Sequence, residues 1–266
     1  MVKIEGTKKA PAAAKGSDQL ALGIDIGGTG IKGAPVDLIK GVLTKERFRI
    51  PTPQPAKPDA VADVVAQVVK HFDWKGPVGC TFPAIIKDGV AFSAANVDKS
   101  WVGTDARSLF ERSTGCSCEV VNDADAAGIA EMEFGAGKGH DKGVVIMVTL
   151  GTGIGSAIFL DGKLFPNAEI GHLEIRGKDA ELRASDHSRE VNEWSWKKWA
   201  GNVDEYLRHI EFLFSPDLII IGGGVSKKAE KFIPLLNTKV KVVPAQMMND
   251  AGIVGGALAA RNLKKA

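Results

Sequence analysis

The sequence predicts an α/β protein made of two related halves, each with a mixed sheet, that flank a cleft. The first observation is a glycine-rich hairpin at residues 20–33 (LALGIDIGGTGIKG), where an apolar strand, a glycine turn and a second strand follow one another. The second is a similar hairpin at residues 143–160, which repeats the tetrapeptide Gly-Thr-Gly-Ile. The third is the predicted order of three strands, helix, strand, helix, strand and helix, which starts again after residue 143. A duplicated unit of this kind indicates two half-domains with a shared architecture.

The predicted division of the chain follows this repeat. We expect a small N-terminal domain at residues 20–123 and a large C-terminal domain at 124–249, with residues 250–266 packing back on the first domain. Residues 1–19 mix Ala, Lys, Gly and Pro without a continuous apolar run, which predicts a disordered tail rather than a signal peptide or membrane span. A tail of this length also leaves no room for a helix-turn-helix. We therefore expect a cytoplasmic protein without membrane or nucleic-acid partners.

Composition agrees with a globular protein. The chain has 266 residues, and 44% of them are hydrophobic, which is enough to form apolar cores. Its net charge of +2 favours no class of partner. Its three cysteines, Cys80, Cys116 and Cys118, form no even disulfide framework. Cys116 and Cys118 are a weak metal signal because no second pair follows them, so free thiols are expected.

Apolar periodicity and turn residues define the remaining elements. In the first half a proline-rich break ends one strand, valines at helical spacing mark a helix, a short hairpin surrounds Asp88 and Gly89, and Thr104 or Asp105 caps a second helix. The second half contains an insertion rich in charge and tryptophan, a helix, a strand that ends in a glycine turn, and a last helix rich in small residues. The predicted elements and the insertion lie, in order, at residues 42–50, 59–72, 77–82, 104–113, 118–121, 165–200, 203–214, 218–221 and 250–260.

The first hairpin is a candidate phosphate site. The missing side chains of Gly27, Gly28 and Gly30 let a phosphate approach backbone N–H groups, while Thr29 adds a hydroxyl and Lys32 a charge. The spacing matches no P-loop, and no helix signal follows the glycines as a dinucleotide-binding turn requires. An ordinary glycine hairpin is the alternative, and the second copy of the motif favours the phosphate site.

The second hairpin repeats the turn but not the carboxylate. Superposing the two tetrapeptides places Val148 where the first copy has Asp25, so only the first hairpin carries a group that attracts metal. Asp25 is therefore a candidate to hold Mg²⁺, directly or through water. The second turn offers further phosphate contacts from Thr149, Gly151, Thr152 and Gly153.

Polar residues gather at two other places. Asn122 and Asp123 end a strand and start a helix, where they either cap that helix or face the cleft beyond the carboxyl ends of the strands. Glu169, His172 and Glu174 lie in the loop sequence EIGHLE. These groups suit the hydroxyls of a sugar, although an exposed loop without a task, or a metal site lacking a third well-spaced ligand, remains an alternative.

The motifs DIGGTGIK, VNDADAAGIAE, TLGTGIGSAIFLDG, AEIGHLE and IIIGGGVS, in that order, resemble the ROK family of sugar kinases over roughly residues 20–260. The resemblance implies an actin-like ATPase (ribonuclease H-like) fold and a kinase that requires Mg²⁺. It implies that Asp123 is the catalytic base and that the two hairpins bind phosphates. It places the adenosine beside residues 222–226, which include Gly222, Gly223 and Gly224. The sugar-binding residues that it implies are Asn96, Asn122, Asp123, Glu169 and His172.

One departure from the family is informative. ROK proteins commonly carry a cysteine-rich zinc site after the Gly-His pair, whereas this chain has no cysteine after Cys118. We therefore expect no zinc. The family's later sugar-binding glutamate adjoins those cysteines, so its counterpart is open: we assign Glu181, with Glu174 as a competitor.

The missing zinc segment and the stretches CTFPAI and GHLEIRGKDAELRAS resemble the polyphosphate-dependent members of the family. This subgroup implies glucose, with mannose as an alternative, as acceptor, polyphosphate and ATP as donors, and allows a homodimer. Basic residues of the insertion and its sequence neighbours would line a track for a polyanion, or form an ordinary solvated face. They are Lys138, Lys142, Lys178, Arg183, Arg189, Lys197 and Lys198. A glucokinase that uses ATP alone is the competing enzyme, and a non-catalytic sugar or nucleotide sensor is the competing class.

Overall fold

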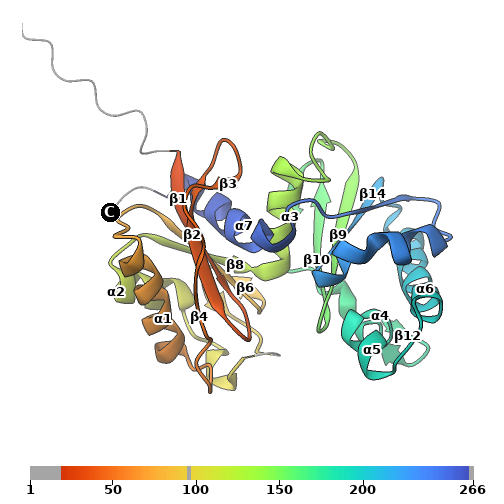
Figure 1. Cartoon of the computed structure of the whole chain (residues 1–266), viewed down its shortest axis with the longest axis horizontal. Coiled ribbons are helices and arrows are strands. Elements are labelled where there is room, and N and C mark those ends of the chain that lie inside the picture. Colours follow the sequence, from red (N-terminus) through yellow and green to blue (C-terminus); the bar gives the residue numbers. More distant parts are fainter. Residues whose placement is uncertain (1–18, 95–96, 264–266) are drawn as a thin grey trace, which may run out of the picture.

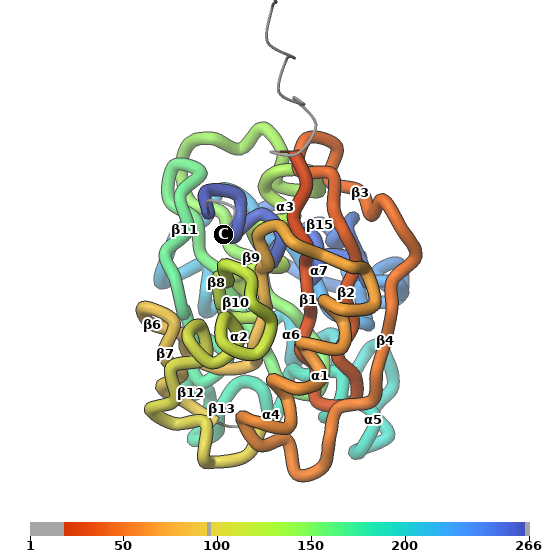
Figure 2. Tube along the Cα trace, turned by 90° about the vertical axis from the view of Figure 1, so that its left-hand side faces the viewer, coloured from red at the N-terminus to blue at the C-terminus, as the bar shows by residue number. Residues whose placement is uncertain are grey.

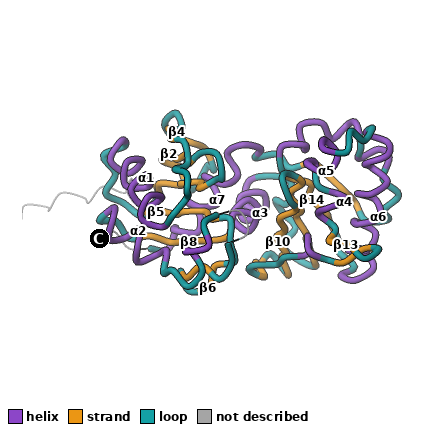
Figure 3. The backbone as a smooth tube through the Cα atoms, turned by 90° about the horizontal axis from the view of Figure 1, so that it is seen from below, coloured by secondary structure: helices purple, strands orange, loops and turns teal. Residues whose placement is uncertain are grey.

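The computed structural model describes residues 19–94 and 97–263. Figure 1 shows two sheets separated by two helices, α3 (Asp123–Phe134) and α7 (Ala251–Ala259). Seen from below, the same division places β5 and β8 on one side of these helices and β10 and β14 on the other (Figure 3). Residues 1–18 of the predicted disordered tail and the predicted sugar ligand Asn96 lie outside the described residues.

The first sheet joins an antiparallel hairpin to parallel strands. Its strand order is β3-β2-β1-β5-β8, and β4 also pairs with β2. β1 and β2 are antiparallel, whereas β1, β5 and β8 run parallel, so their carboxyl ends meet at one edge, where Asp25 pairs with Thr81. The strands are β1 Leu20–Ile26, β2 Ile31–Asp37, β3 Val42–Leu43, β4 Phe48–Ile50, β5 Val78–Phe82 and β8 Cys118–Asn122.

The second sheet repeats this topology. Its order is β11-β10-β9-β14-β15, with β9, β10 and β11 antiparallel and β9, β14 and β15 parallel. The strands are β9 Val144–Leu150, β10 Ile154–Leu160, β11 Lys163–Phe165, β14 Leu218–Gly222 and β15 Lys241–Pro244. The predicted repeat of mixed sheets is confirmed.

The registers of the two hairpins correct one detail. Asp25 pairs with Lys32 one step before the first turn, and Thr149 pairs with Gly155 one step before the second. The first turn holds residues 27–30 and the second only 151–153, so a superposition of tetrapeptides is shifted by one residue. Thr149, not Val148, is therefore the counterpart of Asp25, and the second hairpin still offers no carboxylate at this position.

Helices α3 and α7 connect the halves by close backbone contacts. A Cβ atom on Gly23 of β1 would lie 1.9 Å from the carbonyl oxygen of Ile253, so α7 rests directly on the first sheet. A Cβ on Gly255 would lie 1.8 Å from the carbonyl oxygen of Ala126, where the two helices cross. A Cβ on Gly128 of α3 would meet the second sheet. Each half thus ends in a helix that packs against the sheet of the other half.

Three apolar cores result from this layering. The outer face of the first sheet packs against α1 (Pro58–His71) and α2 (Ala106–Thr114), with Trp101 fully buried. Figure 2 views the molecule from this side. The outer face of the second sheet packs against α6 (Trp196–Phe214), with Trp199 fully buried. The middle core combines small side chains of the first sheet, such as Ala21 and Ala34, and larger ones of the second sheet with α3 and α7.

Two predicted elements have different bounds. The predicted strand at 42–50 is interrupted between β3 and β4, because residues 44–47 (TKER) are all polar and leave the sheet. The helix predicted from residue 203 begins at Trp196, where the side chain of Ser195 accepts a hydrogen bond from the N–H of Lys198 and caps it. The short elements β6 Ile86–Lys87, β7 Val90–Ala91, β12 Glu174–Ile175, β13 Lys178–Asp179, α4 Glu181–Ala184 and α5 Asp186–Val191 complete the fold.

In residues 19–94 and 97–263, no helix has the length and apolar character that a bilayer crossing requires. The three cysteines are buried free thiols. Burial raises the pKa of Cys118 to about 12, so this thiol is not in the thiolate form that binds metal.

Candidate active site

The first glycine turn is supported by polar side chains from the segment that follows β2. Arg49 of β4 donates through Nη2 to the carbonyl oxygen of Thr29 at 2.8 Å. The hydroxyl of Thr52 donates to the carbonyl oxygen of Gly27, and Gln54 Nε2 donates to that of Gly28 at 3.3 Å. These donors satisfy the carbonyl groups, which orients the turn and leaves the N–H groups of Gly28 and Thr29 available to an anion.

Asp25 lies at the end of β1, where two groups already contact its carboxylate. Lys32 Nζ is 3.0 Å from Oδ2, and the hydroxyl of Thr81 donates to Oδ1 at 3.0 Å. A Cβ on Gly252, at the start of α7, would lie 2.7 Å from Oδ2. The side chain of Asp25 is still 20% exposed, so an ion or water can approach it.

Asn122 and Asp123 lie where β8 passes into α3. Asn122 is the N-cap: Oδ1 accepts from the N–H groups of Ala124 at 2.8 Å and Asp125 at 3.0 Å, and Nδ2 donates to the carbonyl oxygen of Ala84 at 3.1 Å. The capping alternative therefore describes Asn122 correctly. All of its polar atoms are used, so Asn122 positions the next residue.

Asp123 is the first residue of α3 and its side chain reaches solvent. Surrounding protein nevertheless restricts hydration of its carboxylate, which is the largest reason why the pKa of Asp123 is raised to about 6. The negative charge of Asp25 raises this pKa further, and that of Glu169 adds to it. The structure thus brings into one electrostatic neighbourhood three carboxylates that lie far apart in the sequence.

The loop that carries Glu169 follows β11 and leads into the 3₁₀ helix Ile170–His172. The side chain of Ser156 on β10 holds this loop, since its hydroxyl donates to the carbonyl oxygen of Ala168 and accepts from the N–H of Ile170. Glu169 is half-buried, and this burial is the main cause of its raised pKa. A partly desolvated carboxylate of this kind binds hydroxyl groups strongly when it ionises.

His172, Asp179 and Glu181 form a polar cluster beside that loop. His172 Nδ1 lies 3.0 Å from Asp179 Oδ2 of β13, and this contact is the main reason why the pKa of His172 is raised. Glu181 Oε2 accepts from the N–H of Ile154 at 3.3 Å, so this glutamate also reaches the second glycine turn.

One ligand atom from each residue of this cluster lies within 4.8 Å of the others, so the cluster could hold a divalent cation. The absence of zinc stays a prediction: we expect elemental analysis of the purified protein to find no stoichiometric zinc, and one zinc per chain would contradict it.

The third glycine turn follows β14. Gly223 has φ +81°, and a Cβ there would lie 2.5 Å from the carbonyl oxygen of Leu150. The turn therefore requires glycine at this residue for its own geometry. Gly224, by contrast, faces open space, because within residues 19–94 and 97–263 no atom beyond its own chain neighbours lies within 4 Å of the place that a Cβ would occupy.

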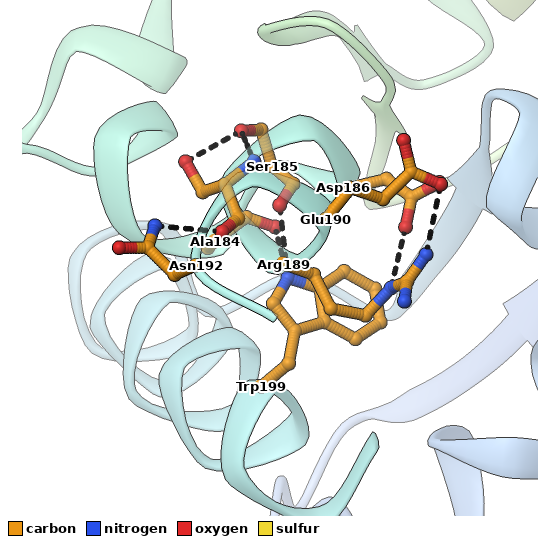
Figure 4. A network of polar contacts seen from close by, with 8 residues as sticks. Ala184, Ser185, Asp186, Arg189, Glu190, Asn192 and Trp199 are labelled. Atoms are coloured by element: carbon orange, nitrogen blue, oxygen red, sulfur yellow. Dashed lines mark hydrogen bonds and ion pairs between the residues drawn. The ribbon is translucent and has the colours of Figure 1, made fainter. Parts of the chain in front are cut away.

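The basic residues of the insertion differ in how far their charges are compensated. Arg183 Nη2 lies 2.6 Å from Glu205, and Figure 4 shows Arg189 paired with both Asp186 and Glu190. Lys197 and Lys198 are exposed and line a shallow pocket of about 590 Å³ at the start of α6. The other residues lining this pocket include Arg176, Arg183, Ser195 and Asn202.

Lys138 and Lys142 do not extend this basic surface. Lys142 lies two residues before β9, whereas the insertion contacts the other end of β9 through a hydrogen bond from His187 N–H to the carbonyl oxygen of Gly151. The prediction that Lys138 and Lys142 lie near the basic residues of the insertion rested on sequence proximity, but β9 separates Lys142 from the insertion.

The structure gathers most of the predicted residues at the facing ends of the two sheets. Glu174 is exposed on β12 and is the weaker candidate of the two glutamates, since Glu181 contacts the second turn. Sequence reasoning missed several residues that orient the site. They are Arg49, Thr81, Asp125, Asn167 and Asp179. Only Asp125 carried a signal, its place beside Asn-Asp at a helix start.

Comparisons with known proteins agree with this geometry. Residues 21–185 match the model of the ROK family. The chain is 50% identical over 254 residues to a protein named polyphosphate glucokinase from Mycobacterium tuberculosis, which covers 95% of both chains.

Solved structures give the same result. An inorganic polyphosphate/ATP-glucomannokinase from Arthrobacter sp. strain KM is 55% identical, with a TM-score of 0.86 over 90% of this chain and 97% of the other. A ROK family glucokinase from Streptomyces griseus, solved with glucose and AMPPNP, is 27% identical, with a TM-score of 0.75 over 91% and 99%. From its matched motifs, its identity to these relatives and its fold, this chain belongs to the ROK family.

Proposed function

We propose that this protein is a sugar kinase that transfers the terminal phosphoryl group of polyphosphate to the 6-hydroxyl of glucose. The observation that carries the proposal is the place of Asp123: it lies at the start of α3, near both Asp25 of the first phosphate turn and Glu169 of the sugar-side loop. Similarity to polyphosphate glucokinases at 50% identity supports the acceptor and the donor.

Asp123 acts as the general base. Phosphoryl transfer proceeds through a loose transition state, so the enzyme mainly positions the sugar hydroxyl in line with the phosphoryl group and stabilises charge on its oxygens. Asp123 accepts the hydroxyl proton as the bond to phosphorus forms. A pKa of about 6 leaves its carboxylate ionised at neutral pH while keeping it basic enough for this task.

Five residues form the sugar side of the site. Glu169 and His172 bind sugar hydroxyls, Glu181 completes the pocket, and Asn122 orients Asp123 by capping α3. Asn96 is retained as a sugar ligand from the sequence alone. Glucose is the primary acceptor, and mannose is a second candidate that the glucomannokinase relative suggests.

The glycine turns bind the donor phosphates. The N–H groups of the first turn and the side chains of Thr29 and Lys32 contact the terminal phosphates, and the second turn contributes Thr149 and Thr152. The position of Lys32 supports this role, because its Nζ lies 3.0 Å from Asp25 Oδ2, next to the first glycine turn. The proposed phosphate-binding glycines are Gly27, Gly28, Gly30, Gly151 and Gly153.

Mg²⁺ fits the donor set around Asp25. A carboxylate and a threonine hydroxyl are hard oxygen ligands of the kind that this ion prefers, and the existing contacts to Lys32 and Thr81 favour binding through water. When bound, Mg²⁺ would neutralise charge on the donor phosphates. The residue that would hold it is Asp25, with the hydroxyl of Thr81, which donates to Asp25 Oδ1, beside it.

The two donors share the terminal phosphate site and separate beyond it. ATP places its adenosine beside the turn at Gly222, Gly223 and Gly224, whereas polyphosphate continues along cations. Lys228 and Lys231, in the 3₁₀ helix after that turn, lie 5.8 and 5.5 Å from the ring centroid of Trp196. Trp196 begins α6, so these lysines connect the turn to the pocket of Lys197 and Lys198.

The halves act as two domains that close on the substrates. We propose the division at residues 20–123 and 124–249, with 250–266 joining the first domain and α3 and α7 as the pivot between them. Closure would exclude water that otherwise competes with glucose as acceptor. A homodimer is compatible with this arrangement and is tested by the molecular mass in solution.

A donor-swap assay tests the function. Purified protein, glucose and either polyphosphate or ATP should yield glucose 6-phosphate, and we expect polyphosphate to support transfer. Transfer from ATP alone would establish the ATP-only glucokinase in its place. Binding of glucose without any product would establish a non-catalytic sensor.

A further inference from the structure

Asn167 connects the two halves of the molecule at the edge of the proposed sugar pocket. It lies in the loop between β11 and the 3₁₀ helix Ile170–His172, two residues before Glu169. Its backbone has φ +59°, a left-handed conformation that asparagine adopts more readily than most residues. The side chain is half-buried and makes contacts outside its own half.

The side-chain amide of Asn167 pairs with the backbone of Ile86 as a neighbouring strand would. The N–H of Ile86 donates to Asn167 Oδ1 at 2.8 Å, and Asn167 Nδ2 donates to the carbonyl oxygen of Ile86 at 2.8 Å. Ile86 belongs to the hairpin β6–β7 of the first half. The Oδ1 and Nδ2 atoms of Asn167 thus both bind the backbone of Ile86, which belongs to the other half.

The backbone of Asn167 is held from a third direction. Its N–H donates to Asp125 Oδ2 at 2.8 Å, and Asp125 is buried in the first turn of α3, two residues after Asp123. A single residue therefore links the hairpin β6–β7, the start of the helix that carries the proposed base and the loop that carries Glu169. Ser156 fixes the same loop only to its own sheet.

We infer that Asn167 is a positioning residue for the sugar: it fixes Glu169 relative to Asp123 by tying the loop to Ile86 in the first half and to Asp125 at the start of α3. This inference rests on the proposed function. Since Glu169 and Asp123 must contact the same sugar from different elements, a loose loop between them would weaken glucose binding without altering the donor site.

Two variants separate the side chain from the backbone strain. Asn167→Gly removes the amide but accepts the left-handed φ, whereas Asn167→Ala removes the amide and adds strain. We expect Asn167→Gly to raise the KM for glucose about 10-fold, with the KM for polyphosphate changed less than about twofold. Asn192→Gly is the control for the loss of an asparagine amide, because among the described residues Asn192 Nδ2 donates to the carbonyl oxygen of Ser188 within α5 and does not contact the loop of Glu169.

A purely structural role would give another pattern. Asn167→Gly would then lower the melting temperature while leaving the KM for glucose unchanged, or would raise both KM values equally, and either result overturns the inference. A wild-type protein that forms no sugar phosphate would refute the proposed function instead. Unchanged glucose KM values in an active enzyme would refute only the role of Asn167.

Hydrogen exchange of the wild-type protein decides the matter even if the variants do not fold. The N–H of Ile86 should exchange slowly, and saturating glucose should slow it by about 10-fold or more, because the sugar fixes the loop that holds this amide. Exchange that is unaffected by glucose at Ile86 overturns the inference.

Discussion

Asp123 is the residue on which we expect catalysis to depend most. Asp123→Asn keeps the shape of the side chain but removes the proton acceptor, so kcat should fall about 10²-fold or more while the KM for glucose changes little. Steady-state kinetics with both substrates varied test this. Turnover close to that of the wild type would show that another group takes the proton.

The raised pKa of Asp123 also predicts the dependence on pH. Since the base must be ionised, kcat should decline below about pH 6 and drop close to tenfold for each further pH unit. Because the pKa of Asp123 is higher in the folded state than in the unfolded chain, protonation of Asp123 stabilises the fold. This contribution to the free energy of unfolding is lost as the pH rises through about 6.

Asp123→Asn should therefore melt at a higher temperature than the wild type at pH 7.5, and the difference should shrink as the pH approaches 4. Thermal unfolding at both pH values measures it. A variant that is less stable at pH 7.5 would contradict the assigned shift.

The sugar-side residues should affect binding more than turnover. Glu169→Ala and His172→Ala each remove one proposed hydrogen bond to the bound sugar; stranding a sugar hydroxyl in the closed site costs about 1–3 kcal/mol and raises the KM for glucose about 5- to 150-fold. Asp179→Asn should have a smaller effect in the same direction, because it weakens only the contact that orients His172. Glu174→Ala, exposed on β12, is the control and should leave this KM unchanged.

At the scale of elements, we expect the turn at Gly222, Gly223 and Gly224 to govern the use of ATP and the start of α6 to govern the use of polyphosphate. Gly224→Val adds bulk where the described part of the chain leaves open space and should impair ATP use more than polyphosphate use. Gly223→Val is unsuitable as a test, because Gly223 has φ +81° and a valine there would distort the turn itself. The double variant Lys197→Ala, Lys198→Ala should impair polyphosphate use more than ATP use. In the wild-type protein, activity with polyphosphate should fall more steeply with salt than activity with ATP.

Donor-varied kinetics at two ionic strengths test both changes. Equal losses with both donors would contradict the separation of the sites. Lys138→Ala with Lys142→Ala is the control, since these lysines belong to the opposite end of β9.

Elements with strong local signals were predictable, and those that depend on distant contacts were not. The two glycine hairpins, the valine-rich helix α1 and the cap residue Asn122 follow from spacing and turn residues, which act over a few positions. Asn167 and Arg49 could not be found in this way. Their roles come from Ile86 and Thr29, which are brought near only by the folded chain.

At the scale of the whole molecule, the repeat predicted two similar sheets, and the structure has them. The repeat by itself did not indicate that each half gives its last helix to the other; that exchange is implied instead by the predicted division, which ends the first domain at residue 123 and packs residues 250–266 on it. Glycines in β1 and α7 contained that information, but an isolated glycine in a strand pattern also fits a bulge or a bend. Only the approach of Gly23 to Ile253 distinguishes these cases.

The exchange of helices has a consequence for how the protein is made. Residues 20–122 of a growing chain can pair their strands and cover one face of the first sheet with α1 and α2, but the other face waits for α7, at residues 251–259. Until then the small apolar side chains Ala21, Ala34 and Val36 have no cover. Such long-range contacts slow folding and leave sticky intermediates exposed. Synthesis must therefore have passed residue 259 before the first sheet is covered on both faces, and the two halves mature together rather than one after the other.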